Sequence, residues 1–286
     1  MIFSPKYVFC LDDDKNFLNF LQVVLFSYFF GYQVISWCGL YKDKNISILT
    51  RILNSIREIA YKRVSKTWAY SKATKSYMVN KINLDENSVF TGLQGYPSEL
   101  VKYKSTNSLE SRYSKKSLVF VGYIDHRKGL EYPLLSAFKN YCNANQGTKL
   151  SVNVVGDCNY LEKLRKTYAN YRVNFYGYLD GEEKYAVIDE SSFLVLPSHD
   201  DPWGWVVNEA SLLSLPCIVS KNAMSNEMTA SELIVAPTTE EFENIFKRLE
   251  EMSLNDYKIL SRNAKFLSEQ HSLSKTIKSF HRIISI

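Results

Sequence analysis

The second half of the chain alternates short apolar runs with amphipathic segments of helical length. Mostly apolar runs of three to seven residues predict strands at Leu118–Ile124, Leu150–Val155, Val173–Tyr176, Phe193–Leu196, Leu215–Ser220 and Leu233–Val235. Apolar residues spaced three or four apart predict helices at about 128–143, 160–169, 182–188, 205–213, 240–252, 256–269 and 274–284. Because such apolar strands are buried on both faces, we expect a parallel α/β sheet with helices on either side.

The first half contains an uncharged segment, Phe17–Trp37, whose length is close to that of a membrane span. Polar residues interrupt it, and Gly31 divides it into Leu18–Phe30, of helical length, and Gln33–Trp37, with a strand pattern. A buried helix followed by a strand is the favoured interpretation, and a membrane span is the alternative. The apolar stretch before it is too short for a signal peptide, and Asp12–Asp14 follow that stretch at once.

A polar segment rich in Ser, Lys and Tyr, at 101–117, separates the two halves and has the composition of a linker. We therefore predict a domain over residues 1–110, a second over 111–270, and a C-terminal helix over 271–286. Strand-and-helix alternation in the second domain implies that ligand-binding residues follow its strands, because open parallel sheets bind ligands at the carboxyl ends of their strands.

The net charge of +5 is carried entirely by the first 110 residues, which contain 14 Lys and Arg against 9 Asp and Glu. Within them, residues 42–81 hold ten basic residues and only Asp43 and Glu58 as acids. A solvated helix face is the favoured interpretation of this run, and contact with an anionic membrane surface is the alternative. Nucleic acid is not expected as a partner, because no nucleic-acid-binding motif accompanies the charge.

The five cysteines are scattered, with no C-x-x-C pair, which supports neither a disulfide framework nor a zinc site and favours a reducing, cytoplasmic location. We interpret Asp12–Asp14 as a solvated turn or helix cap and not as a metal site. The consecutive Ser198, His199 and Asp200 do not form a hydrolase triad, because neighbours in sequence cannot easily converge as a triad must.

A glycine and two cations follow the first strand of the second half, in Gly122-Tyr123-Ile124-Asp125-His126-Arg127-Lys128. At a strand-to-helix turn, backbone N–H groups and the partial positive charge of the helix end attract anions, and Arg127 and Lys128 add full charges. This combination suits a diphosphate.

Two carboxylates, Asp201 and Glu209, follow the fourth strand with seven residues between them. Asp201 precedes Gly204, where the next helix is expected to open, and Glu209 lies inside that helix. An ionised carboxylate accepts two hydrogen bonds and so binds sugar hydroxyls well. The alternative is an acidic first turn that stabilises the helix dipole, with one exposed helical glutamate.

These motifs occur in an ordered set that resembles a known family. FVGYIDHRKGL, VNVVGD, VNFYGYLDGEEKYAVIDESSFLVLPS and DPWGWVVNEASLLSLPCIVS are similar, in this order, to the C-terminal domain of retaining glycosyltransferases of family 4, also called glycosyltransferases group 1. The resemblance covers about residues 116–270. It implies a GT-B fold of two Rossmann-like domains with parallel sheets, of which the N-terminal, acceptor-side one is shortened here.

The resemblance also implies roles for individual residues. Lys128, Asp201 and Glu209 are the expected catalytic residues: Lys128 holds the donor diphosphate with help from Arg127, Asp201 binds sugar hydroxyls and Glu209 binds the ribose. The remaining expected donor-binding residues are Gly122, Tyr123, Tyr178, Leu179, Ser198, Trp203, Gly204 and Trp205. The chemistry of the family implies no metal and no cofactor, because the nucleotide-sugar is itself a substrate.

The sequence departs from the family pattern at several of these places. Tyr123 stands where the family usually has Arg, and Asp201 stands for Glu. Ala223 and Met224 replace paired glycines, and Cys38 stands where a His is common.

The resemblance predicts a retaining hexosyltransferase that moves a sugar from a nucleotide-sugar to a glycan or lipid-linked acceptor. The expected pathway is the synthesis of a surface polysaccharide (capsule, O-antigen or lipopolysaccharide), and the expected location is the cytoplasm or the inner face of the cell membrane. The alternative is a degenerate, non-catalytic GT-B-like binding protein.

Overall fold

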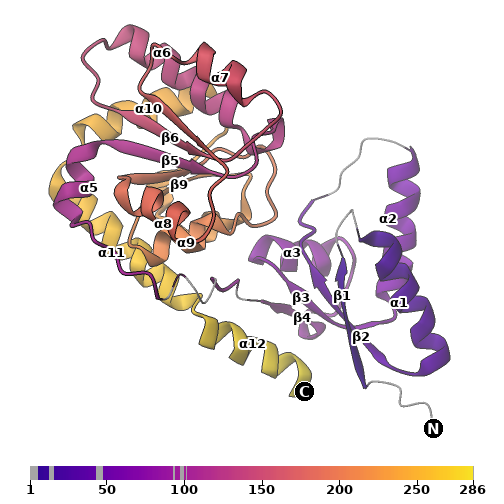
Figure 1. Cartoon of the computed structure of the whole chain (residues 1–286). Helices are drawn as coiled ribbons and strands as arrows, with labels where there is room; N and C mark the ends of the chain where they lie inside the picture. The colour runs from indigo at the N-terminus through magenta and orange to yellow at the C-terminus, as the bar shows by residue number, and fades with distance from the viewer. Residues whose placement is uncertain are drawn as a thin grey trace. The chain divides into compact units, whose positions relative to one another are not determined.

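The computed structural model describes residues 6–12, 16–42, 48–92, 94–96, 100 and 102–285. The chain divides into two compact units. The first comprises Met1–Gln94 with Ser274–Ile286, and the second comprises Gly95–Leu273. Each unit contains its own parallel sheet, and together they give the α/β, two-sheet architecture that was expected of a GT-B protein (Figure 1).

The first unit is a four-stranded parallel sheet in the order β1-β2-β3-β4. Its strands are β1 (Tyr7–Asp12), β2 (Gln33–Cys38), β3 (Val64–Ala69) and β4 (Val89–Thr91), and its helices are α1 (Phe17–Phe30), α2 (Ile48–Tyr61), α3 (Lys72–Asn80) and α12 (Leu273–Ser285). Successive strand residues point to opposite faces. Val34 therefore packs with residues of α1, α2 and α3, whereas Ile35 packs with Phe280 and Ile283 of α12. The C-terminal helix predicted at 271–286 is thus part of this unit.

The segment Phe17–Trp37 folds as α1 followed by β2, and Gly31 ends the helix in the left-handed conformation with its N–H bonded to the Ser27 carbonyl. The expectation of a buried helix is correct for only one face of α1. Phe20 and Val24 are buried, but the outer face carries exposed apolar side chains, namely Leu18, Leu25, Phe26, Tyr28, Phe29 and Phe30. Among the described residues, no helix is long and apolar enough to cross a membrane.

Asp12 does not lie in a solvated turn. It is fully buried at the end of β1, where its carboxylate accepts a hydrogen bond from the Tyr61 hydroxyl at 2.7 Å and pairs with Arg57 Nε at 3.2 Å. Asp12 is not a helix cap either, which was the other interpretation. The N-cap position of α1 is occupied by Asn16, whose side chain makes no capping hydrogen bond. Asp13 and Asp14 lie outside the described residues.

The second unit is a six-stranded parallel sheet in the order β10-β9-β8-β5-β6-β7. Its strands are β5 (Ser117–Val121), β6 (Ser151–Val155), β7 (Val173–Gly177), β8 (Phe193–Leu196), β9 (Cys217–Ser220) and β10 (Ile234–Val235). The helices α6 (Ser136–Ala144), α7 (Leu161–Thr167) and α10 (Thr239–Glu251) cover one face. The other face is covered by α5 (Leu109–Lys115), α8 (Gly181–Glu190), α9 (Val206–Leu212) and α11 (Leu254–Gln270) (Figure 1). All six strands coincide in position with the predicted ones.

One predicted helix of this unit is interrupted. In place of a continuous helix over 128–143, a 3₁₀ turn at His126–Lys128 and a π-helical turn at Leu130–Leu135 precede α6. Tyr132 has non-helical backbone angles (φ −131°, ψ 121°) because it precedes Pro133, and a proline disfavours the helical conformation of the residue before it.

The predicted linker is also structured. Residues 102–117 belong to the second unit, and α5 lies within them. Arg112 of α5 is 2% exposed and forms an ion pair with Asp189, at the end of α8. The boundary predicted at 110/111 therefore falls at Gln94/Gly95 instead, because this buried pair holds the polar segment against the second sheet.

Candidate functional site

The two loops singled out by the sequence follow neighbouring strands of the second sheet. β5 pairs with β6 on one side and with β8 on the other, so the direction of strand addition reverses between β5 and β8. Such a switch point is where open parallel sheets bind ligands. The loop with Arg127 and Lys128 follows β5, and the loop with Asp201 follows β8.

The predicted phosphate and sugar ligands contact each other across this point. Lys128 Nζ lies 2.6 Å from Asp201 Oδ2, and their side chains are 18% and 6% exposed. Lys128 is held by a 3₁₀ turn that Asp125 caps, since the Asp125 carboxylate accepts from the Lys128 N–H at 2.8 Å. The structure thus joins two side chains 73 residues apart into one charged pair at the carboxyl ends of the strands.

The Asp201 loop is tied to the segment after β9. The Asp201 N–H donates to the Asn222 carbonyl at 3.1 Å, and the Met224 N–H donates to the Asp201 carbonyl at 3.0 Å. The Asp201 carboxylate also accepts from the Ser198 hydroxyl and the Trp203 N–H, both at 3.4 Å. The residues that replace the paired glycines therefore support the loop through their backbone.

Gly204 is required by the shape of this loop. Its φ of +85° lies in the left-handed region, and an added Cβ would lie 2.5 Å from Leu196 Cδ2. Gly129, at the end of the Lys128 turn, has a φ of +74°, and a Cβ there would lie 2.2 Å from the Pro197 carbonyl oxygen. Gly129 lets the loop after β5 approach the loop after β8 closely, and Gly204 lets the loop after β8 fold back against its own strand.

The second predicted carboxylate has a cation partner that the sequence analysis missed. Glu209 of α9 is 7% exposed, and its Oε1 lies 3.0 Å from Lys184 Nζ of α8. Burial raises the pKa of Glu209, and the positive charge and hydrogen bond of Lys184 act in the opposite direction. The two residues are 25 positions apart and lie on different helices, α8 and α9. The spacing of residues along the sequence does not predict contacts between two such helices.

A cavity of about 320 Å³ lies beside this pair. It is lined by Val121, Gly122, Tyr123, Val155, Gly156, Asp157, Tyr178, Leu179, Asp180 and Lys184. Four of the predicted donor-binding residues, Gly122, Tyr123, Tyr178 and Leu179, are thus brought together. Tyr123 and Tyr178 are 63% and 74% exposed, so their rings are free of the core.

The other predicted residues lie at the site in different ways. Trp205 is 44% exposed at the start of α9, whereas the Trp203 ring is buried and donates to Asn208 Oδ1 at 2.7 Å. Arg127 directs Nη1 to the Asp200 carbonyl at 3.1 Å. His199 lies at the rim, where its ring stacks on His126 with centroids 5.0 Å apart.

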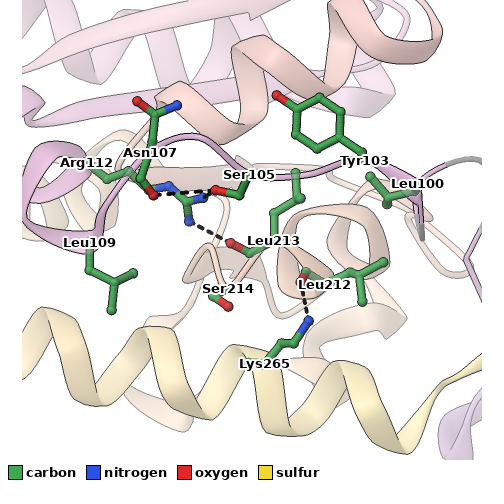
Figure 2. A pocket seen from close by; sticks show the side chains of 10 residues that line it. All are labelled: Leu100, Tyr103, Ser105, Asn107, Leu109, Arg112, Leu212, Leu213, Ser214 and Lys265. Atoms are coloured by element: carbon green, nitrogen blue, oxygen red, sulfur yellow. Dashed lines mark hydrogen bonds between the residues drawn. The ribbon is translucent and has the colours of Figure 1, made fainter.

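The C-terminal end of α9 is anchored by two buried or half-buried cations. Arg112 Nη1 donates to the Leu213 carbonyl at 2.6 Å, and Lys265 Nζ donates to the Leu212 carbonyl at 2.8 Å (Figure 2). Both contacts stabilise carbonyls that a helix end leaves without intrahelical partners. These cations line a separate cavity of about 390 Å³ and hold in place the helix that carries Glu209.

No group of three or more His, Cys, Asp or Glu side chains is placed to hold a metal ion in the part of the chain that the structure describes. The expectation of a metal-free site therefore stays a prediction.

Relatives of known sequence are longer than this chain. An uncharacterized 41.2 kDa protein in the cps region of Klebsiella pneumoniae is 31% identical over 156 residues, which are 54% of this chain and 40% of that protein. An uncharacterized glycosyltransferase of Methanocaldococcus jannaschii is 24% identical over 192 residues, 64% of this chain and 47% of that protein. The matched part thus spans less than half the length of either relative.

Solved structures share the fold at low identity. Anabaena HepE in complex with UDP and glucose matches with a TM-score of 0.77 and 14% identity, covering 98% of this chain and 78% of that one. The apo form of the lipopolysaccharide outer core galactosyltransferase WaaB matches with a TM-score of 0.71 and 16% identity, covering 98% and 75%. The family described as glycosyl transferases group 1 matches residues 101–266, more than half of the chain. The switch-point loops, the two parallel sheets and this match together lead to one conclusion: the chain belongs to the glycosyl transferases group 1 and has a GT-B type of fold.

Proposed function

We propose that the protein is a glycosyltransferase that moves a sugar, with retention of configuration, from a nucleotide-sugar donor to a glycan or lipid-linked acceptor. The observation that carries the proposal is the Lys128–Asp201 pair at the switch point of the second sheet. A cation and a carboxylate side by side match the two parts of a donor, its diphosphate and its sugar hydroxyls. HepE, which has the same fold, is known in complex with UDP and glucose.

Under this proposal, each charged group has a part. Lys128 binds the diphosphate and stabilises the charge that develops on it as the sugar leaves. Asp201 orients the sugar through its hydroxyls, and Glu209 holds the ribose beside the cavity that Tyr178 and Leu179 line. The cations perform the electrostatic work, so the proposed reaction needs no metal and no cofactor.

The purified chain tests this proposal with UDP-, GDP- and ADP-linked sugars, in binding by calorimetry and in donor hydrolysis. We expect one nucleotide class to bind, with Lys128→Ala weakening binding at least tenfold and Lys166→Ala, an exposed lysine of α7, leaving it unchanged. Absence of both binding and hydrolysis across the panel would contradict the proposal.

The second candidate is a GT-B-like protein that binds a donor or glycan without turnover. Tyr123 in place of a phosphate-binding arginine favours it, because one cation of the site is then absent. Asp201→Ala and Glu209→Ala variants distinguish the two: a biological phenotype that survives both substitutions indicates binding without catalysis.

For the acceptor, we propose a lipid-linked glycan of a surface polysaccharide, met at the cytoplasmic membrane face. The relative in a Klebsiella cps region and the lipopolysaccharide galactosyltransferase with this fold support this pathway class.

The outer surface of α1 and α2 supports membrane contact. On α2, Ile48, Ile52, Ile56 and Ile59 recur every three or four residues and are all exposed, which aligns them in one stripe. On α3, in the same layer of the first unit, the exposed stripe is Lys72, Ser76 and Asn80. The outer faces of α1 and α2 are therefore apolar, whereas the outer face of α3 is polar.

Charges around this apolar face are mostly basic. Arg51, Lys62 and Arg63 are exposed, and Glu58 is the only acid between residues 48 and 63. The Arg63 guanidinium also lies 4.9 Å from the Tyr28 ring centroid, which joins the basic rim to the aromatic face of α1. Apolar faces with basic rims bind anionic bilayers at the headgroup level.

Co-sedimentation with phosphatidylglycerol vesicles tests this contact. We expect the wild type to bind anionic but not phosphatidylcholine vesicles, and Ile52→Glu/Ile56→Glu to abolish binding. Ser76→Glu/Asn80→Glu, which adds the same charge to α3, is expected to bind almost as the wild type does. Equal loss in both variants would refute the role of the α2 stripe, and a dimer lost in the Ile52 variant would identify a second copy as the occupant.

A further inference from the structure

Lys184 of α8 lines the 320 Å³ cavity and belongs to neither of the loops that carry Lys128 and Asp201. Its ammonium contacts Glu209 Oε1 at 3.0 Å and Asp180 Oδ1 at 3.9 Å, and its side chain is only 15% exposed. Among the described residues that line the 320 Å³ cavity, it is the one cation. We propose that Lys184 is a positioning residue that holds the Glu209 carboxylate in place to accept the hydroxyls of a ribose.

Glu209 needs such a partner because of where α9 places it. A carboxylate accepts two hydrogen bonds from a vicinal diol only in its ionised form, whereas a protonated carboxyl must donate one of them. Burial disfavours the ionised form of Glu209, and Lys184 favours it. Lys184 therefore opposes the effect of burial on Glu209 and favours the form of the carboxylate that accepts the diol.

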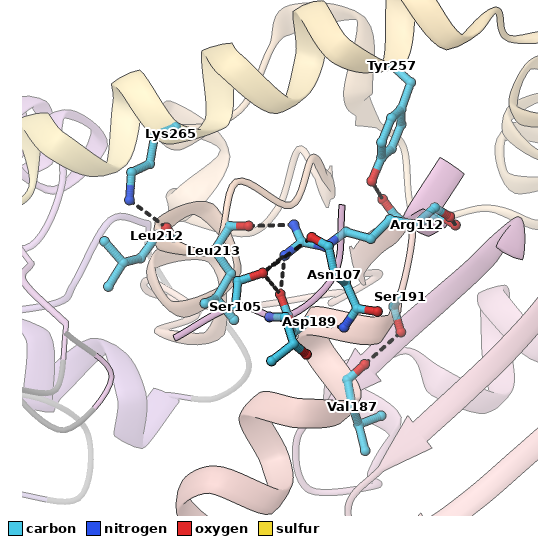
Figure 3. Close-up of polar contacts among 12 residues, drawn as sticks. Ser105, Asn107, Arg112, Val187, Asp189, Ser191, Leu212, Leu213, Tyr257 and Lys265 are labelled. Atoms are coloured by element: carbon cyan, nitrogen blue, oxygen red, sulfur yellow. Dashed lines mark hydrogen bonds and ion pairs between the residues drawn. The ribbon is translucent and has the colours of Figure 1, made fainter. Parts of the chain in front are cut away.

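The position of Lys184 is fixed by a second connection between the same two helices. At their far ends, Arg112 bridges Asp189 of α8 and the carbonyl of Leu213 after α9 (Figure 3). Lys184 and Glu209 connect α8 and α9 near the cavity. The two helices are therefore linked at two places along their length. Because the helices cannot easily separate, the ammonium stays within bonding distance of Glu209 when a ligand enters.

This inference rests on the proposed function, since it assumes that Glu209 meets a ribose. Two measurements on the whole chain test it: UDP and uridine binding from pH 6 to 9, and the titration of Glu209 by carboxyl ¹³C NMR in the ligand-free protein. Wild type, Lys184→Met, Lys184→Arg and the control Lys166→Met are compared.

We expect Lys184→Met to raise the pKa of Glu209 further and to weaken UDP binding several-fold at pH 7, because the buried carboxylate loses the cation that favours its ionised form. Affinity of this variant should recover as the pH rises to 9. Lys184→Arg should restore most of the binding, and uridine should lose affinity in the Met variant as UDP does, because both carry the ribose.

A purely structural role of Lys184 would lower thermal stability and leave the titration and the pH profile of binding unchanged, and that result would overturn the inference. A Glu209 pKa that does not move in Lys184→Met overturns it even if no nucleotide binds. Failure of the wild type to bind any nucleotide, with a Glu209 pKa that does rise in the variant, contradicts the proposed function but upholds the positioning role.

Discussion

Arg112→Met removes the charge that joins α5, α8 and α9 while keeping a long, flexible side chain. In the native protein, Arg112 is 2% exposed, donates to the Leu213 carbonyl at 2.6 Å and to Ser105 Oγ at 2.7 Å, and pairs with Asp189 (Figure 3). The variant leaves Asp189 buried without its cation and the Leu213 carbonyl without its donor.

The structure sets the size of the effect. Removing one partner of a buried ion pair costs about 3–5 kcal/mol. Asp189 keeps bonds from Ser105 Oγ at 2.6 Å, the Thr106 N–H at 3.2 Å and Asn107 Nδ2 at 2.9 Å, which favours the lower end of that range. A loss of about 3 kcal/mol corresponds to a fall in Tm of roughly 6–12 °C for a unit of this size.

Urea unfolding followed by circular dichroism measures the change, with Arg165→Met as the matched control. Arg165 pairs with Glu162 on the surface of α7, where the two side chains are 44% and 79% exposed, and such pairs contribute about 0–1 kcal/mol. The double variant Arg112→Met/Asp189→Leu should lose less than Arg112→Met alone, because no uncompensated charge remains. If Arg112→Met unfolds like Arg165→Met, the buried pair does not hold this unit together and the reasoning fails.

Three further outcomes are expected. Gly204→Ala should destabilise the protein by about 2–4 kcal/mol, from its left-handed φ plus the clash with Leu196, whereas Gly177→Ala, with a similar φ and open space, should cost about 1 kcal/mol in the same urea assay. Asp12→Asn should cost about 3 kcal/mol, because Arg57 stays buried without its carboxylate; a loss below 1 kcal/mol would show that the Asp12 pair is solvated. Tyr123→Arg should tighten UDP binding several-fold at low salt and less at high salt, and an unchanged affinity would place the phosphate away from Tyr123.

The strands of the second sheet and the two loops after β5 and β8 could be predicted because their signals are local. Phe193–Leu196 is a run of four apolar residues ended by Pro197, and the structure gives the strand these same bounds. Lys128 and Asp201 were predicted to lie just after strands, where open parallel sheets bind ligands, and the family resemblance supplied their roles. Periodicity predicted the strands, and topology predicted that the loops after them carry the ligand-binding residues.

Pairs formed by burial could not be predicted in this way. Arg112 stands in a run of Ser, Lys and Asn that is typical of a linker, and its partner Asp189 comes 77 residues later. Lys184 follows two glutamates in the first turn of a helix, a pattern typical of an exposed face. Asp12 is the first of three consecutive aspartates, a pattern typical of side chains exposed to solvent. In each case the polar side chain is buried because a second charge, distant in sequence, compensates it.

The contact between Lys128 and Asp201 limits which molecules can enter between the two side chains. Each of these side chains currently satisfies the other, so an entering molecule must replace both partners at once. A free phosphate that bound Lys128 would leave the Asp201 carboxylate, whose side chain is only 6% exposed, with its bonds from Ser198 and Trp203 but without a cation. A neutral sugar would engage Asp201 at the expense of the ammonium. Under the proposed function, a compound that carries both an anion and hydroxyls can contact the two side chains together, which inorganic phosphate or a free sugar alone cannot do.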